Sequence, residues 1–303
     1  MIWLLAAFVL VLLWMPFALR CVGAGKRPLF GGSILLIGPL FIYQLMNMHS
    51  LFYYPDRVQY DTPERAGLAF EKVYFASADG TRLSGWFIPA KGYPSPLEVK
   101  GTVIHLHGNA QNMTAHWQFV DWMPKRGFNL FVFDYRGYGE SEGRPEPKGV
   151  LEDAVSALNQ MRSRPDVDPE RLLVFGQSLG GTVAIAAAGV SRQGIRAVAV
   201  EAPFYSYSAI ADDHFPGAGR LMDDTWSASQ YVAKLSPIPL LLIHGTRDLV
   251  VPYSHSVTLL AEAGEPKRLI TIENGDHVDS LSGRYGMKYQ DELAVFFEEA
   301  LRR

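Results

Sequence analysis

Cysteine is almost absent from this 303-residue chain, in which Cys21 is the only one. Everything after that position lacks the side chain needed for a disulfide framework or a cysteine-ligated metal site. The eight histidines show no spacing typical of metal ligands, and we expect neither a metal nor another cofactor. A domain without disulfides suits an oxidising compartment as well as the cytosol, so cysteine usage does not decide the location.

Charged residues are equally scarce at the start of the chain, where Arg20, Lys26 and Arg27 are the only ones among the first 46. They separate two uncharged runs, residues 2–19 and 29–46, each 18 residues long. An 18-residue helix extends about 27 Å, close to the roughly 30 Å of a bilayer's hydrocarbon core. We therefore predict an N-terminal hairpin of two transmembrane helices.

This membrane anchor is assigned to residues 1–48, and the basic loop between the two helices sets the expected orientation. Positively charged loops stay preferentially in the cytoplasm, so both ends of the hairpin and the domain that follows are expected on the other side. In a Gram-negative bacterium the chain would then lie in the inner membrane with its main domain in the periplasm. An alternative is that the first run is a signal peptide cut near Ala24, although it lacks a basic n-region.

Basic residues form no cluster in the rest of the chain. When the three of the anchor are subtracted from the total of 28, 25 basic side chains remain against 31 acidic ones, a net charge of −6. This balance argues against nucleic acid as a partner. Internal repeats are also missing, and about 250 residues of ordinary hydrophobicity are typical of one α/β domain.

Residues 49–69 are expected to form a linker, and residues 70–303 a domain in which short apolar runs alternate with helical stretches. Asp79-Gly80, between the first two runs, is a strong hairpin turn. The later runs are almost wholly apolar, as expected for strands buried on both faces. Strands are predicted at residues 70–76, 82–88, 102–106, 128–133, 171–175, 196–200, 240–243 and 268–272, and helices at about 112–125, 148–162, 179–189, 254–263 and 286–301. The pattern predicts an α/β fold with a mostly parallel, doubly wound sheet of eight strands that binds ligands beyond the carboxyl ends of its strands.

Two G-x-S-x-G strings occur, at residues 176–180 and 139–143, and only their context separates them. Ser178 follows the predicted strand RLLVF and precedes the small-residue run LGGTVAIAAA, so it is expected on a tight turn between strand and helix. Ser141 is followed by Gly-Arg-Pro-Glu-Pro, which cannot start a helix at once. Ser178 is therefore the candidate nucleophile, and Ser141 is interpreted as a loop serine.

A serine hydroxyl needs a base to accept its proton and a carboxylate to orient that base. His277 follows the last predicted strand and Asp248 follows the one before it, so both are expected at the sheet edge that carries Ser178. Glu201, at the end of the strand after the nucleophile, is an alternative acid. Acids that flank the histidine lie too close in sequence to reach its far nitrogen, and histidines at other strand ends more often form structural hydrogen bonds. The candidates set aside for these reasons are Asp276, Asp279, His105, His107 and His244.

Acyl transfer also requires hydrogen-bond donors for the negatively charged oxygen of the tetrahedral intermediate. One is the backbone N–H of the residue after the nucleophile, Leu179. The stretch His107-Gly108-Asn109-Ala110 follows the third predicted strand, the position from which a second N–H is supplied. We assign this second donor to Asn109.

Five stretches of the sequence together resemble the α/β-hydrolase superfamily: HLHGNAQN, FDYRGYGESEG, GQSLGG, PLLLIHGTRDLVVP and GDH. The chain order Ser178, Asp248, His277 is also that of the superfamily. The first two stretches are most similar to its membrane-anchored branch, which includes serine-aminopeptidase-like and lysophospholipase-like bacterial proteins and eukaryotic protein depalmitoylases. The resemblance covers about residues 50–300 and implies an α/β-hydrolase fold.

The segment at about residues 203–237 lies where such enzymes place a cap, and its shortness implies a small cap over an open site. Its aromatic residues would line an acyl pocket or pack the cap onto the sheet; they are Phe204, Tyr205, Tyr207, Phe215, Trp226 and Tyr231. We expect a membrane-anchored serine hydrolase of the esterase or lipase-like type that acts on acyl esters, with the bilayer as its partner and source of substrates. Hydrolysis of thioesters or peptides by the same residues, and a non-catalytic membrane scaffold, are the alternatives.

Overall fold

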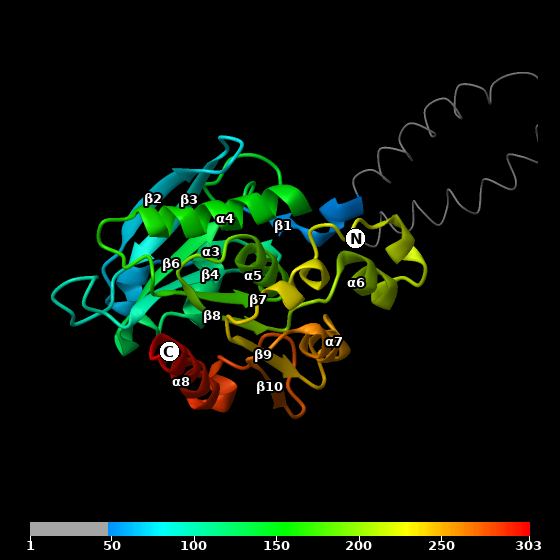
Figure 1. The fold of residues 1–303 in the computed structure, drawn as a ribbon. Coiled ribbons are helices and arrows are strands. Elements are labelled where there is room, and N and C mark those ends of the chain that lie inside the picture. The colour runs from blue at the N-terminus through cyan, green and yellow to red at the C-terminus, as the bar shows by residue number, and fades with distance from the viewer. Residues whose placement is uncertain (1–47) are drawn as a thin grey trace, which may run out of the picture. The chain divides into compact units, whose positions relative to one another are not determined.

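Eight strands form the central sheet of the computed structural model, which describes residues 48–303 (Figure 1). The strands are β2 (Glu71–Ala76), β3 (Arg82–Ile88), β4 (Gly101–Leu106), β6 (Phe128–Asp134), β7 (Leu172–Gln177), β8 (Ile195–Glu201), β9 (Leu240–Gly245) and β10 (Lys267–Ile272). Their order is β10-β9-β8-β7-β4-β6-β3-β2, and all neighbours are parallel except that β3 runs antiparallel to both β2 and β6. The predicted mostly parallel sheet of eight strands is confirmed, with its antiparallel hairpin at the start.

Side chains of the inner strands point alternately into two cores, one on each face of the sheet. In β4, Ile104 belongs to one core and Val103 to the other, and in β7 Val174 and Phe175 divide in the same way. The helices that cover the faces are α3 (Met113–His116), α4 (Pro147–Ser163), α5 (Leu179–Val190), α7 (Ser254–Glu262) and α8 (Lys288–Leu301). Apolar residues of α4, α5 and α7 pack into the first core, and those of α3 and α8 into the second. Burial on both faces explains why these strands read as continuous apolar runs.

Helix α5 lies close to the sheet because its sequence, LGGTVAIAAAGV, consists mainly of small residues. The side chains of Ala184, Ala186 and Ala188 are completely buried. A Cβ atom at Gly189 would lie 2.8 Å from the Cβ of Tyr231, closer than two such atoms can approach. The helix that follows Ser178 is therefore fixed against both the sheet and the cap.

The predicted helix at about 112–125 is instead the single turn α3 followed by two 3₁₀ turns, Trp117–Phe119 and Pro124–Arg126. Trp117, Val120 and Met123 are all buried. All three belong to the core on the face of the sheet that α8 covers. The buried side chains are three residues apart, a spacing closer to the 3.0 residues per turn of a 3₁₀ helix than to the 3.6 of an α-helix. This spacing favours short 3₁₀ turns over one longer α-helix.

Residues 48–69, which include the predicted linker at residues 49–69, form ordered structure against the domain. They contain a 3₁₀ turn at Met48–Phe52, the short strand β1 (Tyr54–Pro55) and a second 3₁₀ turn at Pro63–Ala66. Strand β1 pairs in parallel with β5 (Ala110–Gln111), more than fifty residues away. Such pairing leaves no local periodicity in the sequence, which explains why it was not predicted. This segment belongs to the same compact unit as the rest, Met48–Arg303.

The segment between β8 and β9 contains α6 (Tyr207–His214) and three 3₁₀ turns, Ala218–Leu221, Ala228–Gln230 and Val232–Lys234. It occupies the position predicted for the cap. The two predicted transmembrane helices, residues 2–19 and 29–46, lie outside the described residues. Within residues 48–303, no helix has the length and apolar character needed to cross a membrane.

Candidate active site

Ser178 lies on a strained turn between β7 and α5, with φ 54° and ψ −122°. A non-glycine residue rarely adopts such angles, which cost about 1–3 kcal/mol. Glycines on either side permit the turn: a Cβ atom at Gly176 would lie 2.2 Å from the carbonyl oxygen of Gly180, and one at Gly180 would lie 2.1 Å from that of Leu106. The Ser178 N–H also donates to the Glu201 carbonyl oxygen at 2.8 Å. The close backbone contacts and this hydrogen bond hold the serine at the end of β7.

The imidazole of His277 lies between Ser178 and Asp248. Its Nδ1 is 2.7 Å from Asp248 Oδ2, and its Nε2 is 3.0 Å from Ser178 Oγ. An ionised carboxylate only accepts hydrogen bonds, so Nδ1 carries the proton and Nε2 accepts a hydrogen bond from the serine hydroxyl. In this geometry a histidine can act as general base toward a serine. The structure thus brings together the three residues predicted to be catalytic.

The carboxylate of Asp248 is held by several donors at once. Its Oδ1 accepts hydrogen bonds from the N–H groups of Val250 and Val251, both at 2.8 Å, and its Oδ2 lies 3.2 Å from Nε2 of His244. Burial alone would raise the pKa of Asp248, but hydrogen bonds from His244, His277 and the backbone of Val251 outweigh burial and lower the pKa. Asp248 is therefore ionised at neutral pH and fixed toward the histidine.

Glu201, the alternative acid, contacts the loop that carries His277 rather than the imidazole. Its Oε1 accepts a hydrogen bond from the Ser280 N–H at 2.9 Å, and its Oε2 accepts one from Gln177 Nε2 at 2.7 Å. Burial raises the pKa of Glu201, while these hydrogen bonds from Ser280 and Gln177 oppose the rise. No hydrogen bond within residues 48–303 joins Glu201 to the ring of His277, so the geometry favours Asp248 as the acid.

The other strand-end histidines form structural contacts. His105 is completely buried and bonds through Nε2 to the side-chain oxygen of Gln177 at 3.2 Å. Burial lowers the pKa of His105 to about 3, which keeps its ring neutral. His107 donates from Nδ1 to the Gly108 carbonyl oxygen at 2.7 Å. The third, His244, contacts Asp248 through Nε2. This contact was not predicted, and its only signal in the sequence is the spacing of four residues between His244 and Asp248.

Ser141, the serine of the second G-x-S-x-G string, is completely buried between backbone groups. Its hydroxyl accepts a hydrogen bond from the Ser84 N–H at 2.9 Å and donates to the Asp134 carbonyl oxygen at 2.8 Å. The two aspartates that flank His277 each form an ion pair with Arg284 at 2.9 Å. These groups stabilise loops and are not aimed at the nucleophile.

The two predicted oxyanion donors lie on segments that pack against each other. Leu179 is the first residue of α5, and Asn109 lies in the loop after β4. The two segments touch, since a Cβ atom at Gly180 would lie 2.5 Å from the carbonyl oxygen of His107. Within residues 48–303, the N–H groups of Asn109 and Leu179 have no backbone acceptor. Both therefore remain available to a negatively charged oxygen at Ser178.

Comparisons with known proteins identify the superfamily to which this chain belongs. The family model described as serine aminopeptidase, S33 matches residues 97–229. The protein YfhR of Escherichia coli (strain K12) is 48% identical over 253 residues, which cover 83% of this chain and 88% of YfhR. The α/β-hydrolase domain-containing protein WAV2 of Arabidopsis thaliana is 32% identical over 243 residues, covering 73% of this chain and 77% of WAV2. This chain belongs to the α/β-hydrolase superfamily.

A solved structure shows the same fold as this α/β-hydrolase. The esterase Pf2001 of Pyrococcus furiosus superposes with a TM-score of 0.68 at 21% sequence identity, and the match covers 82% of this chain and 97% of that one. The superfamily inferred from the five sequence stretches is confirmed. With it, the α/β-hydrolase fold and hydrolase chemistry in general are established for this chain.

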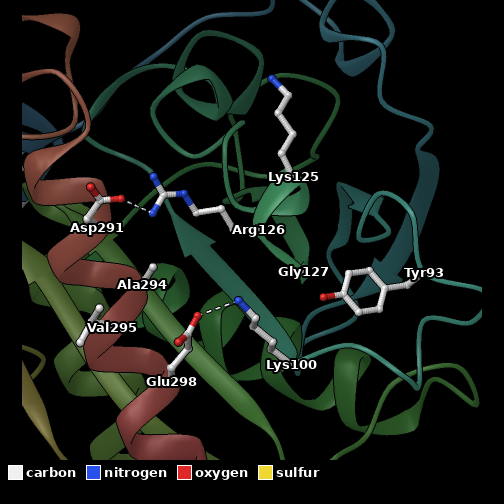
Figure 2. Close-up of a pocket in the computed structure, with 9 residues that line it drawn as sticks. All are labelled: Tyr93, Lys100, Lys125, Arg126, Gly127, Asp291, Ala294, Val295 and Glu298. Atoms are coloured by element: carbon white, nitrogen blue, oxygen red, sulfur yellow. Dashed lines mark hydrogen bonds and ion pairs between the residues drawn. The ribbon is translucent and has the colours of Figure 1, made fainter.

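A surface pocket of about 510 Å³ in this hydrolase lies between α8 and the segment that leads into β6 (Figure 2). Four of its charged residues form two ion pairs, Lys100 with Glu298 at 2.6 Å and Arg126 with Asp291 at 2.5 Å. The fifth, Lys125, pairs with Asp121 at 3.5 Å. Ser178, His277 and Asp248, called the triad below, do not line this pocket. Within residues 48–303, no group of three or more histidine, aspartate or glutamate side chains is arranged to hold a metal ion. The triad therefore defines the candidate site of the hydrolase.

The cap residues of the hydrolase divide into buried and accessible ones. Phe204 and Tyr207 pack into the core and are not accessible to a substrate. Phe215 is half exposed, and the exposed fraction of Leu249, directly after the acid, is 89%. His214, at the end of α6, forms a hydrogen bond through Nε2 with the carbonyl oxygen of Val250 at 2.9 Å. This bond joins the cap to the loop that carries Asp248. Exposed apolar side chains thus lie at the end of α6 and on the loop of the acid.

Proposed function

We propose that this α/β-hydrolase is a membrane-anchored serine hydrolase that cleaves carboxylic esters, with acyl esters derived from lipids as its substrate class. One observation carries the proposal: the continuous hydrogen-bond chain from Ser178 Oγ through His277 to Asp248. A strained, glycine-flanked turn holds the serine at the start of that chain.

Acylation begins when Ser178 Oγ bonds to the ester carbonyl carbon while His277 Nε2 takes the hydroxyl proton. The carbonyl oxygen becomes negative and accepts hydrogen bonds from the N–H groups of Asn109 and Leu179. Asp248 stabilises the positive charge that forms on the imidazole. The intermediate then breaks its bond to the alcohol oxygen, which receives the proton from His277, and the acyl group stays on Ser178.

Deacylation repeats these steps with water in place of the alcohol. His277 takes a proton from water as the water oxygen bonds to the acyl carbon, and the same two N–H groups bind the oxyanion. When the bond to Ser178 Oγ breaks, that oxygen recovers the proton from His277. The products are the carboxylic acid and the free serine.

The main alternatives to this proposal concern the bond that is cleaved. The esterase Pf2001 supports the choice of an ester. The matching family model, described as serine aminopeptidase, favours an amide instead, and the same triad also suits a thioester. The exposed side chains of Phe215, at the end of α6, and Leu249, next to Asp248 in the sequence, support an acyl substrate, because such side chains can cover an alkyl chain.

The membrane anchor is proposed from the sequence, on the two uncharged runs at residues 2–19 and 29–46. The basic loop between them supports an orientation with the hydrolase domain on the periplasmic side of a bacterial inner membrane. Tethering at the bilayer raises the local concentration of lipid-borne substrates, which is the argument for lipid-derived esters.

Acyl esters are expected to be hydrolysed with a higher kcat/KM than thioesters or aminoacyl amides. The measurement uses full-length protein in detergent, a series of acyl chain lengths, and Ser178→Ala as the blank. We expect a rise in kcat/KM with chain length, because each added methylene that is buried contributes roughly 0.8 kcal/mol. A clear preference for amides at every chain length would refute the ester proposal in favour of the peptidase.

The proposed orientation predicts that Cys21, in the basic loop, is protected from a membrane-impermeant maleimide in intact spheroplasts and reacts in inverted vesicles. Because it is the only cysteine, the labelling needs no other change to the chain. In a Cys21→Ser background, Arg303→Cys at the exposed C-terminus should react in the opposite pattern. Labelling of Cys21 in intact spheroplasts would place that loop outside the cytoplasm and contradict the orientation.

A further inference from the structure

We propose that residues 48–60, called the leading segment below, position the oxyanion loop of the active site and connect it to the cap. The oxyanion loop is defined as residues 107–114. The inference rests on the proposed function, because it takes the Asn109 N–H as a donor to the oxyanion. None of the residues predicted to act on the substrate lies in the leading segment, so its role is one of positioning.

The carbonyl oxygen of Asn109 accepts two hydrogen bonds from outside the oxyanion loop. The N–H of Tyr54 donates at 2.8 Å and the hydroxyl of Tyr138 at 2.7 Å. A carbonyl oxygen has two lone pairs, and these two donors use both. They fix the peptide plane on one side of Asn109 and so restrict the orientation of its N–H on the other. An oxyanion donor is effective only when it is already aimed at the place where charge develops.

Contacts between the two segments continue beyond Asn109. Strand β1 pairs with β5, and the Asp56 N–H donates to the Gln111 carbonyl oxygen at 3.2 Å. The side-chain amide of Asn112, completely buried, donates to Asp56 Oδ1 at 2.7 Å and to the Val58 carbonyl oxygen at 2.8 Å. Gln111 has φ 62°, a conformation that non-glycine residues seldom adopt and that these bonds hold in place. The leading segment thus immobilises a loop that would otherwise be free to move.

The other end of the leading segment contacts the cap. The hydroxyl of Tyr53, which is only 5% exposed, lies 2.7 Å from the hydroxyl of Tyr207 in α6. The rings of Phe52 and Tyr207 meet edge to face with their centroids 5.1 Å apart. His49 Nε2 accepts a hydrogen bond from the Asp223 N–H at 3.2 Å. Figure 1 shows the start of the described chain, in blue, beside α6.

Two neighbouring residues therefore join separate parts of the site, Tyr53 to the cap and Tyr54 to the oxyanion loop. Neighbouring residues on an extended chain move together, so a displacement of the leading segment would change both parts. The predicted membrane anchor, residues 1–48, ends where this segment begins. The chain that leaves the anchor consequently runs along the oxyanion loop before it enters the central sheet.

Three variants of the full-length protein in detergent test this role. Tyr54→Pro removes the N–H that donates to Asn109, Tyr138→Phe removes the hydroxyl that donates to the same oxygen, and Tyr53→Phe removes the bond to Tyr207. Tyr74→Phe is the matched control, because it removes one tyrosine hydroxyl that donates at 2.6 Å to Glu140, on an exposed surface of β2.

We expect Tyr54→Pro and Tyr138→Phe each to lower kcat about tenfold, less than the 10²- to 10³-fold caused by loss of an oxyanion donor itself. KM should change less than twofold. Affinity for an alkyl boronic acid, which forms a tetrahedral adduct with Ser178, should fall in proportion to kcat/KM. Tyr53→Phe should lower kcat by a smaller factor, and Tyr74→Phe should leave all three quantities unchanged.

A purely structural role for the leading segment would lower the melting temperature without this kinetic signature. The inference is overturned if the folded Tyr54→Pro protein keeps the kcat and boronic-acid affinity of the parent. It is also overturned if KM rises while kcat stays constant. Should Tyr54→Pro fail to fold, Tyr53→Phe decides the question, because Tyr53 also lies in the leading segment; an unchanged kcat in that variant would overturn the inference. An absence of any Ser178-dependent hydrolysis in the parent would instead refute the proposed function, and this inference with it.

Discussion

Replacement of Ser178 by alanine is expected to lower ester hydrolysis by about 10⁵-fold or more and to abolish labelling by a fluorophosphonate probe. The reason is that the substitution removes the only oxygen within residues 48–303 that forms a hydrogen bond with His277 Nε2, at 3.0 Å. The residual rate would come from the oxyanion donors and from substrate binding, which the variant keeps. Initial rates in detergent and in-gel fluorescence of the labelled protein measure both effects.

Ser141→Ala is the control for this experiment, because Ser141 lies in the second G-x-S-x-G string. It should keep its labelling but lose about 1–3 kcal/mol of stability, since the Ser84 N–H and the Asp134 carbonyl oxygen would be left without their partner. Labelling that survives in Ser178→Ala, or that disappears in folded Ser141→Ala, would show that the nucleophile is assigned to the wrong serine.

Asp248→Asn is expected to lower kcat by about 10⁴-fold while the protein stays folded. The asparagine oxygen can still accept the N–H groups of Val250 and Val251. The NH₂ group of the asparagine then faces His277 Nδ1. Because NH₂ can only donate, Nδ1 must give up its proton before it can accept this hydrogen bond. The proton moves to Nε2, where it faces Ser178 and prevents the imidazole from acting as a base. Steady-state kinetics and a thermal melt of the same sample test the two halves of this expectation.

The matched substitution Glu201→Gln separates the two candidate acids. Glutamine keeps the oxygen that accepts the Ser280 N–H, and Glu201 makes no hydrogen bond to the imidazole. We therefore expect kcat to fall by less than about tenfold, far below the effect of Asp248→Asn. A larger loss of kcat in Glu201→Gln than in Asp248→Asn would make Glu201 the acid.

The sheet could be predicted from the sequence because burial on both faces leaves a local signal. Strands such as β7, LLVFGQ, contain no charged residue, and a doubly wound sheet orders such strands with helices between them. Segments that depend on distant partners gave no such signal. The turns at residues 113–126 follow the spacing of buried side chains under the sheet, and β1 forms only because β5 offers a parallel partner.

The candidate site divides along the same line. The order of strand ends brings Ser178, His277 and the acids to one edge of the sheet, so the sequence could nominate them. It favoured Asp248, which follows β9, over Glu201, which ends β8, but it could not show which carboxylate contacts the imidazole. The choice depends on which carboxylate lies 2.7 Å from His277 Nδ1, and that distance depends on the conformation of two separate loops, those after β9 and β10.

By itself, the sequence determined the superfamily, the sheet and the strained serine turn, because all of these follow from local requirements. A Cβ atom at position 176 or 180 would collide with neighbouring backbone. A chain that forms this turn therefore needs glycine at both positions, and the pattern can be recognised in the sequence. Only the tertiary structure decided how the donor at Asn109 is held. Its carbonyl is fixed by Tyr54 and Tyr138, residues 55 and 29 positions away. Hydrogen bonds between residues so far apart in the sequence form only after the chain has folded, and the local sequence pattern does not predict them.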